Sequence, residues 1–225
     1  KEAADMLETY MADDCGMDVK RDGNNLWCIA GGYDTKRPTL MLNAHIDTVK
    51  PTNAWKHNPF HATIEDDLIY GLGSNDDGAS LVSMLQVFRE LKDTGLTYNL
   101  VLAISAEEEV SGKNGMERLL TLMPKIDVAL VGEPTGMQPA IAEKGLMVLD
   151  VTAHGKAGHA ARNEGENAIY KALDDIQWFR NHPFTKESPL LGPVKMSVTQ
   201  VNAGTQHNVI PDLCTFVVDI RSNEC

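Results

Sequence analysis

Hydrophobic and polar positions follow two periods in the first 140 residues. Short continuous apolar runs, typical of strands that are buried on both faces of a sheet, occupy 39–44, 99–105 and 126–131. Apolar positions at helical spacing predict helices at 2–14, 77–94 and 115–123. Because strands and helices alternate, we expect an α/β fold whose mostly parallel sheet carries helices on both faces.

The pattern changes after about residue 140. Strands are predicted at 146–153, 193–201 and 213–221, and a helix is predicted at 163–181. This order favours a smaller α+β domain with one solvent-facing sheet face. The expected division is therefore a first domain over 1–140 and a second domain over 141–225.

The composition excludes some classes of partner. The chain of 225 residues has 20 basic and 32 acidic residues, a net charge of −12. This argues against nucleic acid and anionic membranes as partners and leaves small molecules. No apolar run approaches the roughly 18 residues of a membrane-spanning helix. The four cysteines form no CxxC pair, which favours reduced thiols and a cytoplasmic location.

Acidic residues and one histidine follow the predicted strands or open a predicted helix. They are His45, Asp47, Asp76, Glu107, Glu108 and Glu133. In open α/β sheets, ligands bind beyond the carboxyl ends of the strands, so these side chains are expected to meet there. Carboxylates and imidazole bind divalent metals, and the pattern predicts a pair of such ions. Asp47 is expected to hold the unused ring nitrogen of His45.

Each of these motifs also has a simpler interpretation when it is taken alone. His45 and Asp47 are equally explained by a chance pair in a polar turn. The glycine-rich 71–78 is compatible with a phosphate loop, but no lysine follows and two aspartates stand where phosphate would lie. Helix capping is a further interpretation of those aspartates. Glu107–Glu109 is either a solvated acidic loop or a place where one carboxylate binds metal and its neighbour abstracts a proton.

Six segments give the sequence a family likeness. They are NAHIDTVKP, YGLGSNDDG, SAEEE, VGEPT, AHGKAGHAA and NVIPD, spread along the whole chain. The sequence resembles the dinuclear-zinc amidohydrolase and peptidase family that includes acetylornithine deacetylase, succinyl-diaminopimelate desuccinylase, aminoacylase and carboxypeptidase G. The resemblance implies a zinc-hydrolase catalytic domain and a smaller lid domain, through which the protein forms a homodimer.

The resemblance also implies roles in the first domain. Two zinc ions are expected, with cobalt or manganese as alternatives. His45 and Glu133 would bind one ion and Glu108 the other, with Asp76 shared between them. Glu107 would be the general base, so that Glu107→Gln keeps zinc and loses turnover. The Asp76–Asp77 peptide bond would be cis.

In the second domain, the likeness points to four residues. His159 would donate to the oxyanion in the active site of the partner subunit. Asn208 and Arg221 would hold the substrate carboxylate, because an arginine fork suits a carboxylate. Glu143 stands where desuccinylases tend to carry an arginine and would instead meet a substrate amine, such as that of ornithine. A turn histidine, a surface arginine and a surface Glu143–Lys144 pair are the simpler alternatives.

The family's last metal ligand is a histidine that has no match here. The chain is therefore expected to be a fragment with an incomplete lid and an incomplete shell for the second ion. The favoured function is hydrolysis of the amide bond of an N-acyl amino acid, above all deacetylation of N-acetylornithine in arginine biosynthesis. Succinyl-diaminopimelate desuccinylase and a dipeptidase or aminopeptidase are the enzyme alternatives, since one metal core serves them all. A metal-binding dimeric scaffold is the alternative without catalysis.

Overall fold

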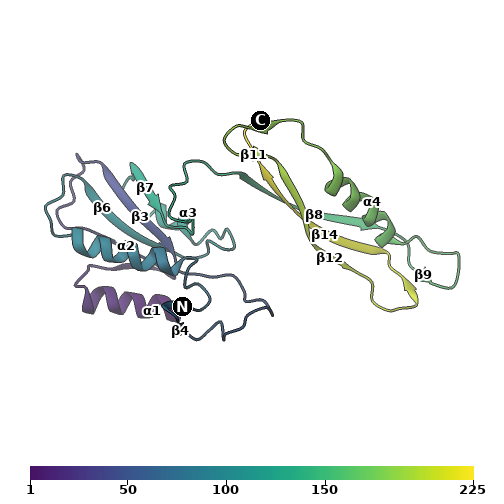
Figure 1. The fold of residues 1–225 in the computed structure, drawn as a ribbon, viewed down its shortest axis with the longest axis horizontal. Coiled ribbons are helices and arrows are strands. Elements are labelled where there is room, and N and C mark those ends of the chain that lie inside the picture. Colours follow the sequence, from purple (N-terminus) through teal and green to yellow (C-terminus); the bar gives the residue numbers. More distant parts are fainter. The chain divides into compact units, whose positions relative to one another are not determined.

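Two units divide the chain. The computed structural model describes residues 1–225, which separate into Lys1–Gln138 and Pro139–Cys225 (Figure 1). The division lies close to the boundary expected at residue 140, while the roles assigned to the two domains stay predictions. None of the helices combines the length and the hydrophobicity that a membrane crossing requires.

A five-stranded sheet forms the centre of the first unit, in the order β1-β2-β6-β3-β7. Its strands are β1 (Lys20–Asp22), β2 (Asn25–Ile29), β3 (Thr39–His45), β6 (Asn99–Ser105) and β7 (Val128–Val131). β3 pairs in parallel with both β6 and β7, whereas β1 and β2 join antiparallel. The carboxyl ends of β3, β6 and β7 therefore lie along one edge of the sheet, as in the α/β fold expected from the sequence.

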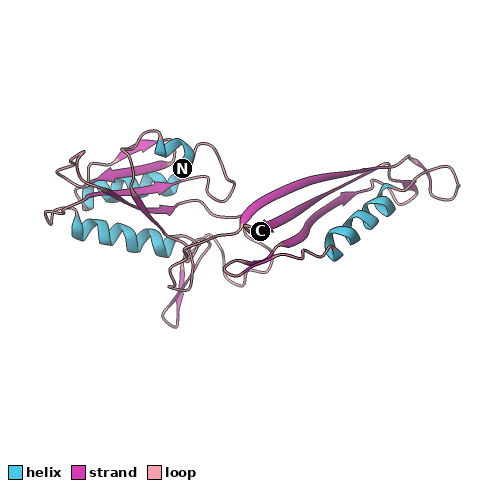
Figure 2. Ribbon diagram, turned by 90° about the horizontal axis from the view of Figure 1, so that it is seen from above, coloured by secondary structure: helices cyan, strands magenta, loops and turns pink.

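Helices cover both faces of this sheet. α1 (Glu2–Thr9), which continues as a π-helical turn over Tyr10–Asp14, and α2 (Gly78–Leu91) pack on one face; α3 (Met116–Leu120) packs on the other (Figure 2). Phe88 of α2 joins the core around Leu102, and Leu119 of α3 joins the opposite core around Val101. Adjacent strand residues point to opposite faces, so β6 contributes to both cores and is buried throughout.

β7 differs from the expectation of a buried strand. It lies at the sheet edge and pairs only with β3, and Val128, Leu130 and Val131 are 60%, 56% and 56% exposed. An apolar run indicates a strand that can be buried, but it does not show how many neighbouring strands cover it.

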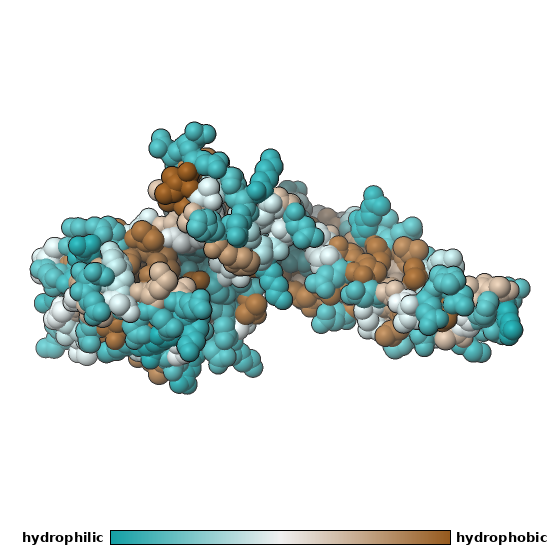
Figure 3. Space-filling model, turned by 90° about the horizontal axis from the view of Figure 1, so that it is seen from below, coloured by the Kyte–Doolittle hydropathy of each residue, from teal (hydrophilic) through white to brown (hydrophobic).

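A hairpin of β4 (Thr63–Glu65) and β5 (Leu68–Tyr70) was not predicted from the sequence. Apolar groups reach the surface in patches, brown among teal in Figure 3.

The second unit is a three-stranded antiparallel sheet with one helix on it. The sheet has the order β12 (Lys195–Ala203), β14 (Leu213–Ser222) and β8 (Gly145–His154). α4 (Ala168–Asn181) buries Ala172 against Phe216 and Val218 of β14. The helix begins at residue 168 rather than 163, because Asn167 caps it: its side-chain oxygen accepts the Ile169 N–H at 2.9 Å.

Four short strands complete the second unit. They are β9 (Gly158–His159), β10 (Glu187–Ser188), β11 (Gly192–Pro193) and β13 (Val209–Ile210). β9 pairs with β13, and β10 pairs with β11. The β9–β13 pair places His159 opposite Val209, beside Asn208.

Candidate metal centre

The carboxyl ends of the parallel strands carry the acidic groups. His45 is the last residue of β3, the pair Glu108 and Glu109 follows the end of β6, and Glu133 follows β7. Asp76 lies just before α2, whose first turn reaches the same edge because Asp77 accepts the backbone N–H of His45 at 3.1 Å. Residues far apart in sequence therefore meet where an open α/β sheet binds ligands.

Four carboxylates converge around the imidazole of His45. His45 Nε2 lies 3.1 Å from Asp76 Oδ1 and 4.0 Å from Glu133 Oε1. The ligand atoms of His45, Asp76 and Glu133 all lie within 4.8 Å of one another, and so do those of His45, Glu108 and Glu109. The predicted His45, Asp76, Glu108 and Glu133 thus come together, and Glu109 joins them.

The backbone determines which ring nitrogen of His45 faces the cluster. Nδ1 lies 2.9 Å from the carbonyl oxygen of Asp47. A carbonyl oxygen can only accept, so Nδ1 of the neutral imidazole carries the proton and Nε2 presents its lone pair to Asp76 and Glu133. The ring is only 2% exposed, which fixes this orientation.

The carboxylate of Asp47 holds the acidic loop rather than the ring. Its Oδ1 accepts the Glu108 N–H and its Oδ2 accepts the Glu109 N–H, each at 3.2 Å, while Oδ1 is 3.6 Å from His45 Nδ1. The ring N–H of His45 donates to the backbone carbonyl of Asp47 rather than to the expected side chain. Asp47 therefore connects the end of β3 to the loop after β6, and it orients both His45 and the two glutamates.

Glu107 has different surroundings from the next two glutamates. Its backbone is left-handed, with φ of 60°, and its carboxylate accepts the backbone N–H and the side-chain amide of Asn114, both at 3.1 Å. A Cβ at position 112 would lie 2.5 Å from Glu107 Cβ, so the loop is packed too closely for a side chain there. Glu107 belongs to neither group of converging ligand atoms.

Two members of this site were not assigned by the sequence reading. Asp77 is 1% exposed; one carboxylate oxygen accepts the His45 N–H and the other, Oδ1, has no hydrogen-bond partner. Its position at the start of α2 is the only signal that sequence offered. Glu109 had no separate signal, because three consecutive glutamates do not indicate which of them face inward. The expected cis bond is present between Asp76 and Asp77.

The cluster is electrostatically unfavourable without a cation. Partial desolvation is the largest cause of the raised pKa of both Glu108 and Glu133, and neighbouring carboxylates raise it further. Burial lowers the pKa of His45, but the Asp47 carbonyl and the Asp76 carboxylate raise it, and the net shift is upward. A divalent ion would neutralise this repulsion.

The donor set fits zinc-type ions. Zinc binds imidazole nitrogen and carboxylate oxygen, and a lone pair on His45 Nε2 lies 3.1 Å from an Asp76 oxygen that also only accepts. Two acceptors at this distance require a proton or a metal ion between them. Asp77, with its unpartnered buried oxygen, adds negative charge behind the cluster.

The second unit places its four predicted residues at two ends of its sheet. His159 and Asn208 lie together at one end, where the Ala160 N–H donates to the Asn208 carbonyl at 2.9 Å. Arg221 lies near the far end of β14, opposite Leu146 of β8, eight residues beyond Leu213 or roughly 26 Å away. The structure thus brings His159 and Asn208 together but not Asn208 and Arg221.

Arg221 already has a carboxylate partner. Its Nε and one terminal nitrogen donate to Asp219 at 2.9 and 3.1 Å, and this pairing raises the pKa of Arg221, with a smaller contribution from the charge of Glu143. Glu143 is exposed. The side chain of Lys144 donates to the Pro193 carbonyl rather than to Glu143.

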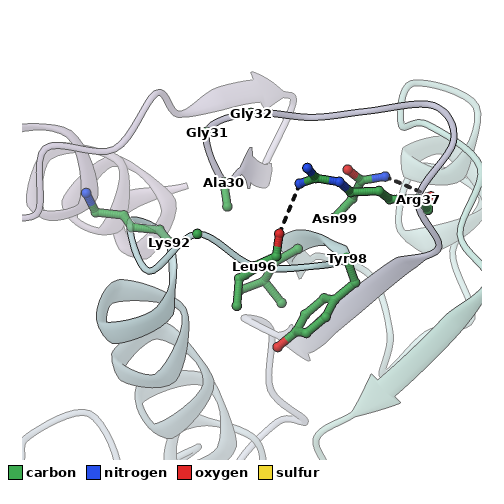
Figure 4. A pocket seen from close by; sticks show the side chains of 10 residues that line it. Ala30, Gly31, Gly32, Arg37, Lys92, Leu96, Tyr98 and Asn99 are labelled. Atoms are coloured by element: carbon green, nitrogen blue, oxygen red, sulfur yellow. Dashed lines mark hydrogen bonds between the residues drawn. The ribbon is translucent and has the colours of Figure 1, made fainter.

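A separate cavity lies at the other end of β6, beside its first residue, and has no metal-binding side chains. It has a volume of about 240 Å³ and lies between the residues after β2 and the turn after α2 (Figure 4). Arg37 donates to the Leu96 carbonyl across it, and Asn99, the first residue of β6, donates to the Arg37 carbonyl. No carboxylate or histidine lines it, so the candidate site is the cluster at the other end of β6.

Known proteins resemble this chain in sequence. A succinyl-diaminopimelate desuccinylase from Paracoccus denitrificans is 30% identical over 222 residues, which cover 92% of this chain and 58% of that protein. An acetylornithine deacetylase from Pectobacterium carotovorum is 30% identical over 195 residues, which cover 81% of this chain and 50% of that protein. The chain thus spans about half the length of the curated relatives it matches.

A solved structure has the same fold, and a family model matches the sequence. The crystal structure of an M20 family metallo-carboxypeptidase, Sso-CP2 from Sulfolobus solfataricus, superposes with a TM-score of 0.70 at 19% identity, over 99% of this chain and 66% of that one. The sequence model of Peptidase family M20/M25/M40 matches residues 41–218, from β3 through the metal cluster and into β14. Because this match extends over most of the chain and both of its units, the protein belongs to peptidase family M20/M25/M40.

Proposed function

We propose that the protein hydrolyses the amide bond of an N-acyl amino acid with the help of bound metal ions. The observation that carries this proposal is the convergence of Asp76, Glu133 and the Glu108–Glu109 pair on Nε2 of a buried His45. Such a donor set suits metal-assisted hydrolysis, and two relatives that are 30% identical are named for amide-cleaving activities.

Two zinc ions are the proposed cofactors, with cobalt or manganese as alternatives. His45, Asp76 and Glu133 would hold one ion, and the acidic loop, through Glu109, would contribute to the second. The ions, when bound, would polarise the substrate carbonyl and make the attacking water more acidic. The hydrogen bonds of Asp47 hold His45 and the acidic loop in fixed positions relative to each other.

Glu108 is the proposed general base. Glu108 is exposed, whereas Glu109 is partly buried. A general base must be accessible, because it takes a proton from water and passes it to the departing amine. Glu107, first expected to have this role, is engaged by Asn114 and serves as an anchor of the loop. The metal-ligand role first given to Glu108 passes in this proposal to Glu109.

The second unit supplies the proposed substrate contacts. His159 would donate to the developing oxyanion, Asn208 and Arg221 would bind carboxylate, and Glu143 would meet a substrate amine. Arg221 would exchange its internal partner Asp219 for substrate, or bind beside it. Since Asn208 and Arg221 lie at opposite ends of β14, contact with one substrate requires two chains, which supports a homodimer formed through this unit.

Deacetylation of N-acetylornithine in the cytoplasm, in arginine biosynthesis, is the specific activity we propose. An acidic Glu143 suits the cationic side chain of ornithine. The second candidate is succinyl-diaminopimelate desuccinylase, which one relative at 30% identity favours. Three buried cysteines without disulfide partners are consistent with a cytoplasmic protein.

The test is amine release by the zinc-loaded protein, with N-acetylornithine and N-succinyl-diaminopimelate run side by side. We expect a preference for the acetyl substrate that weakens in Glu143→Ala. A preference for the succinyl substrate would support the second candidate instead. Release from neither substrate, by a chain that binds zinc, would favour the metal-binding scaffold.

A further inference from the structure

A carboxylate with an unsatisfied oxygen lies behind the metal centre. Asp77 is 1% exposed, and its Oδ2 accepts the backbone N–H of His45 at 3.1 Å. Its other oxygen, Oδ1, is enclosed by the protein and has no hydrogen-bond partner. Buried polar atoms without a partner are rare, because each costs free energy, and the cost is larger for an ionised group. The stability of the fold alone does not explain a carboxylate at this position.

Helix capping does not account for the burial of Asp77. The residue is the N-cap of α2, a position at which an aspartate side chain usually accepts an N–H of the first helical turn. The Asp77 side chain makes no such bond and instead holds the last residue of β3. The helix dipole favours a negative charge here, but an exposed aspartate would gain from it without the cost of burial.

The first turn of α2 contacts the chain beside two candidate metal ligands. Asp77 holds the backbone of His45 at the end of β3. A Cβ on Gly132 would lie 2.4 Å from the Cβ of Ser80, so the same turn packs closely against the residue that precedes Glu133. The turn therefore helps to fix the ends of β3 and β7, from which two of the ligands project.

The charge of Asp77 also acts on these ligands. Desolvation is the largest influence on the pKa of His45, which it lowers, and on that of Glu133, which it raises; the charge of Asp77 is among the influences that raise both pKa values. Burial raises the pKa of Asp77 itself, and the Ser80 hydroxyl and the His45 N–H offset only part of that rise. A negative potential of this kind also favours a divalent cation beside these groups.

We propose that Asp77 is a positioning residue of the metal centre, which holds His45 through its backbone and supplies uncompensated negative charge that favours a bound cation. The inference rests on the proposed function only in that a metal ion binds. The buried oxygen destabilises the metal-free protein, and a bound ion offsets this cost. The same charge therefore weakens the fold and strengthens metal binding.

Asp77→Asn separates the charge from the hydrogen bond. The amide oxygen can still accept the His45 N–H, but the negative charge is lost. We expect zinc affinity, measured by competition with a chelator, to fall about tenfold. The urea midpoint of the metal-free protein should rise instead, because a buried charge is removed. A purely structural role would not change these two quantities in opposite directions.

Asp77→Ala removes the hydrogen bond as well. The His45 N–H then has no acceptor, so we expect zinc affinity to fall at least as far as in Asp77→Asn and the urea midpoint to fall too. Asp18→Asn, at an exposed aspartate before β1, is the matched control for the change in charge and should leave both quantities close to those of the wild type. Unfolding is followed by tryptophan fluorescence in a Trp178→Phe background, in which the remaining tryptophans lie in the first unit.

Unchanged zinc affinity in either variant of Asp77 would overturn the proposal, and so would a metal-free midpoint of Asp77→Asn that does not rise. These measurements need no turnover, so they are separate from the test of the proposed function. If zinc affinity and stability change as expected but no N-acyl amino acid is cleaved, the role of Asp77 stands and the hydrolase assignment fails. If the amide is cleaved and Asp77→Asn binds zinc as tightly as the wild type, the hydrolase assignment stands and the role of Asp77 fails.

Discussion

The carboxylate of Glu107 is held by Asn114, which donates to it from both its backbone N–H and its side-chain amide at 3.1 Å. Asn25, buried in β2, donates to the Asn114 carbonyl at 2.6 Å and accepts the Ala106 N–H at 2.8 Å. The acidic loop is thus fixed to the centre of the sheet by its first glutamate. The next two glutamates are left to face His45.

Substitution of each glutamate by glutamine should separate their roles. We expect Glu108→Gln to bind zinc normally and to lower kcat by about 10²-fold or more, because it removes the proposed general base. Turnover of the same substrate and zinc content after gel filtration are the two measurements. Normal turnover in Glu108→Gln would exclude it as the base.

Glu107→Gln is the matched comparison on the same loop. The amide can accept only through one oxygen, so a hydrogen bond from Asn114 is lost and stability falls by about 1 kcal/mol. We expect kcat to change far less than in Glu108→Gln, with the loss seen in urea unfolding instead. If Glu107→Gln keeps zinc but loses turnover, Glu107 is the general base, as the family resemblance first indicated.

The sequence was sufficient to predict the members of the site that stand at fixed points of the fold. His45 ends β3, Asp76 precedes α2 and Glu133 follows β7, and parallel strands bring such positions to one edge. The inward-facing members of Glu107–Glu109 could not be predicted in this way. Identical neighbours have no periodicity, and the choice depends on a left-handed backbone at Glu107 and on Asn114, seven residues later.

The same limit applies to the surface of the fold. The apolar composition of β7 suggested burial, yet burial depends on which strands and helices lie beside it, and β7 has one neighbour. The β4–β5 hairpin was missed because its turn residues, Asp66 and Asp67, adopt φ of 49° and 62° without the glycine that usually marks such a turn. The pattern of apolar residues predicted where strands and helices lie better than it predicted how deeply each is buried.

Asp47→Ala should weaken metal binding without removing a ligand. The backbone carbonyl that orients His45 remains, but the N–H groups of Glu108 and Glu109 lose their acceptors. We expect zinc affinity to fall by about 10–100-fold, as for other groups that orient metal ligands. Competition with a chelator measures it, and Asp67→Ala, an exposed aspartate on the β4–β5 turn, is the control. An unchanged affinity would show that the loop holds its position without Asp47.

The metal-free protein should lose stability as pH rises. The pKa of His45 is raised above 6.5, so its contribution is present below that value and lost as pH rises through the raised pKa. The pKa values of Glu108 and Glu133 are raised above 4.5, so their ionisation on the alkaline side also disfavours the folded state. All three groups act in the same direction.

Urea unfolding in the presence of a chelator at pH 5 and pH 7 measures this effect. The wild-type protein should lose more stability between these two pH values than a Glu108→Gln, Glu133→Gln double variant, and saturating zinc should abolish the difference. A double variant with the same pH dependence as the wild type would show that Glu108 and Glu133 do not contribute to it.

Mixing two inactive variants tests whether His159 acts across a dimer. His159→Ala should lower kcat by about 10²-fold if it stabilises the oxyanion, and Glu108→Gln removes the base. In a hybrid dimer, the site with an intact Glu108 meets the intact His159 of the other chain. Random assortment should therefore restore about a quarter of the wild-type activity. A mixture of Glu108→Gln with the chain that has both substitutions is the control and should stay inactive. If the first mixture also stays inactive although the chains exchange, His159 does not act on a partner's site.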